Sequence, residues 1–95
     1  MVHVLARISV KPEAAAAAAQ ILQKLAEATR REAGCISYTL FHRGDAPHLF
    51  QTVEKWTDQA AADAHMTTPH VQAAIAAAGA LFSAPPDIAS YTQLS

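Results

Sequence analysis

The sequence predicts an α+β fold of the ferredoxin-like, split βαβ class, with a four-stranded antiparallel sheet that carries both helices on one face. Two observations predict it. Apolar spacing switches between strand and helix periods in the order β-α-β-β-α-β, and Pro or Gly marks most of the boundaries. At 95 residues, the chain has the length of one domain, which we expect to span residues 1–95.

The first strand and the first helix are separated by a proline. Residues 2–10 alternate loosely and are rich in β-branched side chains, which favours a strand. Pro12 suits the first turn of a helix, and Glu13 is favourable at a helix N-terminus. Apolar residues at helical spacing then continue to Glu32, and Gly34 follows just past the expected helix end.

A hairpin and a second helix follow. Residues 35–42 and 48–56 read as two paired strands around a turn at residues 43–47, which contains both Gly and Pro. Thr57 is the expected N-cap of the next helix, which should reach about Met66.

The C-terminal part repeats the same helix-start signal. Thr68 and Pro69 again combine a capping side chain with a proline, and they predict a helical segment that reaches about Ala80. A Pro-rich loop at residues 84–87 leads to the fourth strand, at residues 88–94.

Both faces of the expected sheet are apolar, although helices can cover only one of them. In the first strand one face carries Val2, Val4, Ala6, Ile8 and Val10, and the other carries Leu5. In the second strand Ile36, Tyr38 and Leu40 face one way and Phe41 the other. In the third strand Phe50 and Trp56 lie opposite to Leu49 and Val53. A second copy that stacks sheet on sheet is the economical cover, so we expect a homodimer through the sheet faces.

Composition excludes several classes of partner. The net charge is −1 and no basic stripe is present, which argues against nucleic acid. No apolar run approaches the roughly 20 residues needed to cross a bilayer, and no signal peptide is visible, so we expect a cytoplasmic protein without membrane contact. Cys35 is the single cysteine, and we interpret it as a buried, inert thiol.

Polar and aromatic side chains gather in one part of a chain that has few of either, with 6% aromatic and 16% charged residues. Glu54 and Trp56 end the third strand, and His65 and His70 flank the break in the helix that follows. The i, i+5 spacing of the two histidines across a break does not place both imidazoles on one helical face. We therefore expect no metal site there.

Four segments carry a pattern that spans essentially the whole chain. They are Glu13, residues 31–38 (Arg-Glu-Ala-Gly-Cys-Ile-Ser-Tyr), residues 50–56 (Phe-Gln-Thr-Val-Glu-Lys-Trp) and residues 65–70 (His-Met-Thr-Thr-Pro-His). Together they resemble the antibiotic-biosynthesis monooxygenase (ABM) domain, and within it the small quinol-monooxygenase-like branch. The resemblance implies a dimeric α+β barrel with a pocket between each sheet and its helices. The family that the chain resembles includes members that oxygenate phenols or quinols with O₂ and no cofactor, and other members that degrade haem.

The haem-degrading branch does not match. Haem-degrading members of the family that this chain resembles share three residues: an Asn on the first strand, a Trp on the second helix and an axial His further on. The corresponding positions here are Arg7-Ile8, His65 and Ile75. We therefore expect no haem and no other cofactor, and the absence of a GxGxxG motif or phosphate loop agrees with this.

The resemblance and the chemistry together select candidate catalytic residues. His65 is a candidate general base for a phenolic hydroxyl, because a histidine titrates near neutrality; the alternative is a half-buried histidine that fills space under the sheet. Tyr38 is a candidate donor to a substrate oxygen. His70 either binds substrate or packs at the helix break.

Further residues are candidates for binding the substrate. Trp56 shares a strand face with Phe50, and either ring could stack on a substrate or serve as core. Glu54 on the same face must be paired or reach solvent, and we expect Arg7 or His65 as its partner. Phe82 is expected to line the pocket or the dimer interface.

Two functions follow. The first is a cofactor-independent monooxygenase that oxidises a quinol or another hydroxylated aromatic with O₂. The alternative is a non-catalytic dimeric module of the same fold that binds a small apolar ligand, because one scaffold can host either role.

Overall fold

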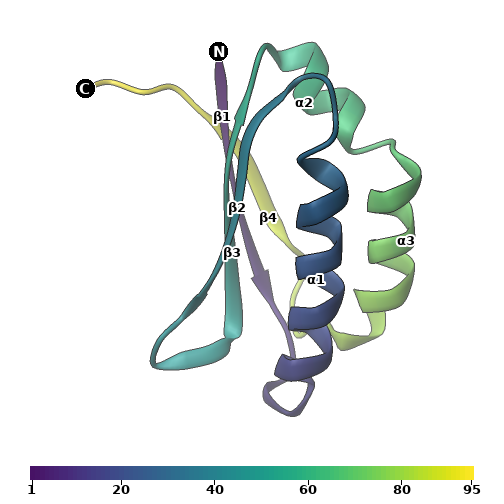
Figure 1. Cartoon of the computed structure of the whole chain (residues 1–95). Helices are drawn as coiled ribbons and strands as arrows, with labels where there is room; N and C mark the ends of the chain where they lie inside the picture. The colour runs from purple at the N-terminus through teal and green to yellow at the C-terminus, as the bar shows by residue number, and fades with distance from the viewer.

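A four-stranded antiparallel sheet forms one layer of the protein, and all the helices lie on one face of it (Figure 1). The computed structural model describes residues 1–95. The strands are β1 (Val2–Ser9), β2 (Cys35–Arg43), β3 (Ala46–Trp56) and β4 (Asp87–Tyr91). The helices are α1 (Ala15–Thr29), α2 (Gln59–His65) and α3 (Pro69–Ala78), with 3₁₀ turns at Pro12–Ala14 and Gly79–Leu81. The strand order β2-β3-β1-β4 confirms the ferredoxin-like class.

Helix α1 ends three residues earlier than its apolar spacing indicates, and this places Glu32 in a turn. The Thr29 hydroxyl donates to the Leu25 carbonyl at 2.7 Å in the last helical turn. The backbone N–H of Glu32 then donates to the Thr29 carbonyl at 3.0 Å, the i to i−3 pattern of a tightened helix end. Glu32 therefore lies in the turn between α1 and β2.

The sequence predicts the N-cap of α3 correctly but not the N-cap of α2. Thr57 is not the N-cap of α2: Asp58 takes that place, and its carboxylate accepts the backbone N–H of Ala61 at 2.8 Å. The predicted cap of α3 is confirmed, since Thr68 accepts from the backbone of Val71 at 3.4 Å, next to Pro69 in the first turn.

The inner face of the sheet carries the core in two clusters. One consists of Val4, Ala26, Tyr38, Trp56 and Ala62. The other consists of Ile8, Val10, Ala18, Leu22 and Phe50. Inward side chains follow period two along β1 and β3, as the sequence predicts.

A β-bulge in β2 changes which side chains face the core. Cys35 pairs with Trp56 and Ser37 pairs with Lys55, so Ile36 is the extra residue between them. Ile36 is 48% exposed and does not share the inner face with Tyr38, contrary to the alternation assumed from the sequence. The bulge restores the register that turns Tyr38 inward, opposite Glu54.

The outer face of the sheet is uncovered within one chain (Figure 1). Phe41 is 53% exposed and Val53 is 42% exposed on this face, as two-sided apolar strands predict. None of the helices has the length and apolar character required to span a bilayer.

Candidate active site

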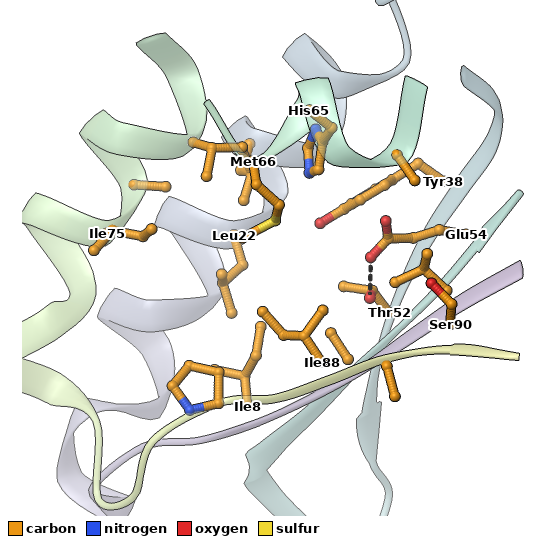
Figure 2. A pocket seen from close by; sticks show the side chains of 18 of the residues that line it. Ile8, Leu22, Tyr38, Thr52, Glu54, His65, Met66, Ile75, Ile88 and Ser90 are labelled. Carbon is orange, nitrogen blue, oxygen red and sulfur yellow. Dashed lines mark hydrogen bonds between the residues drawn. The ribbon is translucent and has the colours of Figure 1, made fainter. Parts of the chain in front are cut away.

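An apolar cavity of about 270 Å³ lies between the inner face of the sheet and the three helices (Figure 2). Its apolar wall includes Ile8 from β1, Leu22 from α1, Met66 after α2, Ile75 from α3 and Ile88 from β4. The volume is near the lower end of the range for ligand pockets, and it suits a small ring system.

Polar side chains meet at one end of this cavity. The buried ionisable ones are Tyr38 from β2, Glu54 from β3 and His65 from the last turn of α2 (Figure 2). All three are at most 5% exposed. A few convergent polar groups in a largely apolar pocket are the arrangement expected of a site that orients a ligand.

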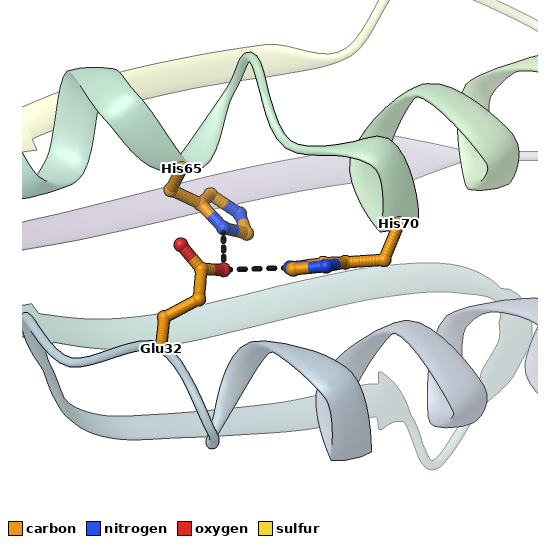
Figure 3. A group of neighbouring side chains, drawn as sticks. All are labelled: Glu32, His65 and His70. Atoms are coloured by element: carbon orange, nitrogen blue, oxygen red, sulfur yellow. Dashed lines mark hydrogen bonds and ion pairs between the residues drawn. The ribbon is translucent and has the colours of Figure 1, made fainter.

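His65 is held from behind by a carboxylate. Its Nδ1 lies 2.6 Å from Glu32 Oε2, and Nε2 of His70 lies 2.7 Å from the same oxygen (Figure 3). An ionised carboxylate only accepts hydrogen bonds, so both ring nitrogens donate to it. In the neutral imidazole of His65 the proton is then on Nδ1, and Nε2 carries the lone pair.

Two polar atoms among the Tyr38, Glu54 and His65 side chains make no hydrogen bond to the protein. The Tyr38 hydroxyl points into the cavity (Figure 2), and neither this oxygen nor His65 Nε2 makes a hydrogen bond to the protein. Every side-chain nitrogen or oxygen that is sealed from solvent has a partner. Both atoms are therefore open to the cavity, one as a donor and one as an acceptor.

Burial fixes the protonation state of the Tyr38 phenol. Burial chiefly, and then the nearby Glu54 carboxylate, raise the pKa of Tyr38 far above its usual value. The hydroxyl therefore keeps its proton at neutral pH and can donate it in a hydrogen bond. The same two causes, burial first and then the neighbouring carboxylates of Glu32 and Glu54, raise the pKa of the Cys35 thiol.

Glu54 is satisfied by neutral donors from its own strand. Its Oε2 accepts from the Thr52 hydroxyl at 2.6 Å, and its Oε1 accepts from the Trp56 indole N–H at 3.0 Å. The expected pairing with Arg7 or His65 is wrong. Arg7 points to the outer face of β1, where it is exposed, and His65 is bonded to Glu32 instead.

Trp56 supports the site without lining the cavity. It is 1% exposed, and its ring packs against the imidazole of His65 with centroids 4.8 Å apart and planes inclined by 37°. Phe50 likewise lies in the core beside the cavity. Of the two readings open from the sequence, core packing describes both rings. Phe82 does line the cavity, as expected.

His70 does not reach the cavity, although it lies close to His65. Their ring centroids are 6.1 Å apart, because the helix break turns α3 so that both imidazoles meet one carboxylate. The expectation that an i, i+5 spacing keeps them apart is wrong, since it assumed a continuous helical geometry.

Glu32 is the residue that the sequence reasoning missed as part of the site. Its position at the end of an amphipathic helix is typical of a solvated charge. The available signal was Gly34, two residues further on, which lets the turn approach α2: a Cβ at residue 34 would overlap Ala61 and lie 3.3 Å from the Thr57 hydroxyl. This close approach brings Glu32 to His65.

Comparison with known proteins decides the family. The sequence model of the family described as antibiotic biosynthesis monooxygenase matches residues 1–77 of this chain. The chain belongs to this family. The resemblance carried by residues 31–38, 50–56 and 65–70 is thereby confirmed.

Relatives of the family agree in sequence and fold. YcnE of Bacillus subtilis is 37% identical over 95 residues, which is 100% of this chain and 99% of YcnE. Rv0793 of Mycobacterium tuberculosis is 33% identical over 84 residues, 88% of this chain and 82% of Rv0793. Both are named as monooxygenases on a provisional basis. A crystal structure of an antibiotic biosynthesis monooxygenase superposes with a TM-score of 0.94 at 29% identity and covers 100% of both chains.

Proposed function

We propose that this ABM-family protein is a cofactor-independent monooxygenase that oxidises a quinol or another hydroxylated aromatic with O₂. The observation that carries the proposal is the pair of unpartnered polar atoms in an apolar cavity, His65 Nε2 as acceptor and the Tyr38 hydroxyl as donor. A phenol offers the complementary groups: an O–H to donate and an oxygen that gains negative charge as the proton leaves.

The chemistry begins with proton transfer. His65 Nε2 accepts the phenolic proton, and the anion gives up an electron to O₂ more readily than the neutral phenol does. The imidazolium that forms is stabilised through Nδ1 by Glu32. Tyr38 donates a hydrogen bond to the developing phenolate oxygen in a largely apolar cavity, where a positioned donor stabilises the developing charge.

The overall reaction balances without an external reductant. A hydroquinone and O₂ give a hydroxyquinone and water: one oxygen atom enters the ring, and the other leaves as water with two hydrogens from the substrate. The substrate itself supplies all the electrons. Glu54 stays bonded to Thr52 and Trp56, and its carboxylate faces the same end of the cavity, where it can accept from a second substrate hydroxyl.

The proposal includes a homodimer that covers the outer face of the sheet. The exposed apolar side chains of that face, Phe41 and Val53 among them, are the support for it. The polar end of each cavity is lined by elements of its own chain, so the dimer would stabilise the sheet rather than complete that end of the site.

Oxygen uptake tests the proposed reaction. We expect the purified protein, in chelator-treated buffer, to consume O₂ with at least one member of a panel of hydroquinones and polycyclic phenols. With isotopically labelled dioxygen, one labelled atom should appear in the quinone product. Binding of these phenols with no oxygen uptake from any of them would contradict the monooxygenase and favour the non-catalytic ligand-binding module.

A further inference from the structure

The Glu32, His65 and His70 side chains form a second potential site behind the cavity. They come from the turn after α1, the end of α2 and the start of α3, and one ligand atom from each lies within 4.8 Å of the other two. Two imidazoles and one carboxylate are a ligand set that zinc uses in enzymes that keep an open coordination position. We infer that this cluster binds a divalent transition-metal ion, with Zn²⁺ as the best fit, and that the bound ion switches off the base function of His65.

The distances in the cluster are close to those of a metal site. An ion at the position of the shared oxygen Oε2 would lie 2.6 Å from His65 Nδ1 and 2.7 Å from His70 Nε2. Zinc–nitrogen bonds are about 2.0–2.1 Å, so each imidazole needs to approach by only roughly 0.5–0.7 Å while the carboxylate rotates aside. The second oxygen of Glu32, Oε1, makes no hydrogen bond to the protein and is available as a ligand (Figure 3).

The cluster also has the charge and the access that a cation requires. With both histidines neutral, the three side chains carry the single negative charge of Glu32. The side chain of His70 is 28% exposed and that of Glu32 is 16% exposed, whereas that of His65 is 6% exposed. An ion therefore enters from the His70 side, and the His65 ring separates it from the cavity.

Metal binding reverses the hydrogen-bonding role of His65 at the cavity. A neutral imidazole has one N–H and one lone pair, so an ion on Nδ1 requires that lone pair, and the proton moves to Nε2 by exchange with water. No proton is gained or lost in this step, and no electron is transferred. Nε2 then donates instead of accepting, and it cannot take the phenolic proton. This part of the inference rests on the proposed function; the binding of the ion does not.

Zinc titration of the purified protein tests the site directly. We expect isothermal titration calorimetry to show one Zn²⁺ per chain, and Co²⁺ to produce visible absorption bands when it occupies the same ligands. His70→Ala and Glu32→Gln should each weaken zinc binding by at least about tenfold. His42→Ala, which removes an exposed histidine elsewhere, should bind as the wild type does. Zinc binding that survives both ligand substitutions, or no binding at micromolar zinc, would overturn the site.

The switch has a readout that does not need the oxygenase activity. Nitrogen NMR of the imidazoles should show His65 Nε2 without a proton in the metal-free protein and with a proton once Zn²⁺ is bound. If the quinol reaction occurs, zinc should lower kcat without raising KM, and the rate of His70→Ala should be insensitive to the same zinc concentration. An Nε2 that remains unprotonated with zinc bound would overturn the switch, whatever the outcome of the oxygen-uptake experiment.

Discussion

Glu32 and His65 are 33 positions apart in the chain, yet Oε2 of one lies 2.6 Å from Nδ1 of the other. This hydrogen bond affects the chemistry of His65 as well as its position. A carboxylate at Nδ1 fixes which tautomer of the imidazole is present, holds the ring in place and stabilises the imidazolium that forms when Nε2 takes up a proton. Glu32 is thus a positioning residue for His65, because it does not itself line the cavity.

Removal of Nε2 should abolish most of the proposed activity. His65→Asn retains an amide N–H that can donate to Glu32 but has no basic nitrogen in the cavity. A positioned general base contributes roughly 10²–10⁴-fold, so we expect a loss of kcat for quinol-dependent oxygen uptake of about that size. His42→Ala serves as the control. A His65→Asn enzyme with wild-type kcat would assign the proton transfer to another group.

Loss of the charge on Glu32 should slow the reaction while leaving substrate binding intact. A hydrogen bond to a charged group is worth about 1.5–3 kcal/mol, so Glu32→Gln should lower kcat by roughly 10–100-fold. KM should hardly change, because Glu32 makes no contact with the cavity. Steady-state kinetics with the same quinol measure both constants. A rise in KM at constant kcat would mean that Glu32 only shapes the pocket.

The raised pKa of Tyr38 predicts a loss of stability at high pH. In the unfolded chain this phenol releases its proton near its ordinary pKa of about 10, whereas the folded protein retains it. The unfolded state then binds fewer protons, so the free energy of unfolding falls as pH rises above about 10. Tyr38→Phe should show a smaller fall, and near-wild-type stability at neutral pH, because the hydroxyl has no partner in the protein.

Urea unfolding at several pH values measures this effect. The comparison belongs in a Cys35→Ser background, because the raised pKa of that thiol adds a loss of the same sign that begins at lower pH. Equal slopes of unfolding free energy against pH with and without the Tyr38 hydroxyl would contradict the retained proton.

The apolar outer face predicts the oligomeric state. Light scattering at micromolar concentration should report about twice the 10.1 kDa mass of one chain. Val53→Glu places a charge at a position that is 42% exposed in one chain and would be buried between two sheets, so it should shift the mass toward one chain. Gln20→Glu, on the exposed side of α1, should leave the mass unchanged. A wild-type monomer would contradict the sheet-to-sheet dimer.

The fold was predictable because local signals agree with the tertiary arrangement. Strand alternation, Pro69 at a helix start and two-sided apolar strands each describe a feature that the structure contains. Tyr38 also faces the core, as the sequence predicts, but only because of a bulge at Ile36 that no local sequence pattern indicates. Bulges of this kind depend on pairing between strands, which period-two reasoning does not include.

The site was predictable only where residues share one element. Glu54 and Trp56 lie two apart on a strand, and they do face the same way and bond to each other. The contacts made by Glu32 depend on a helix end, a loop and a helix break, none of which periodicity resolves. The sequence therefore indicates both imidazoles, but it predicts the wrong partner for Glu54 and no role for Glu32.

Gly34 should be essential to the placement of α2, and a second glycine provides a matched comparison. A Cβ at residue 34 would overlap the Cβ of Ala61 on α2, whereas a Cβ at Gly44 meets nothing within 4 Å. Neither glycine has a positive φ, so the two alanine variants differ in packing and not in backbone strain. Gly34→Ala should cost about 1–3 kcal/mol of unfolding free energy, as overpacking does, and Gly44→Ala should cost little.

The effect of Gly34→Ala should extend to the active site, because the displaced helix carries His65. We expect α2 to move away from the turn that holds Glu32, lengthening the bond to Nδ1 and reducing kcat along with stability. Chemical denaturation measures the first effect and quinol-dependent oxygen uptake the second. Two alanine variants of equal stability would show that the turn and α2 accommodate a methyl group between them. The close approach at Gly34 would then not explain how Glu32 reaches His65.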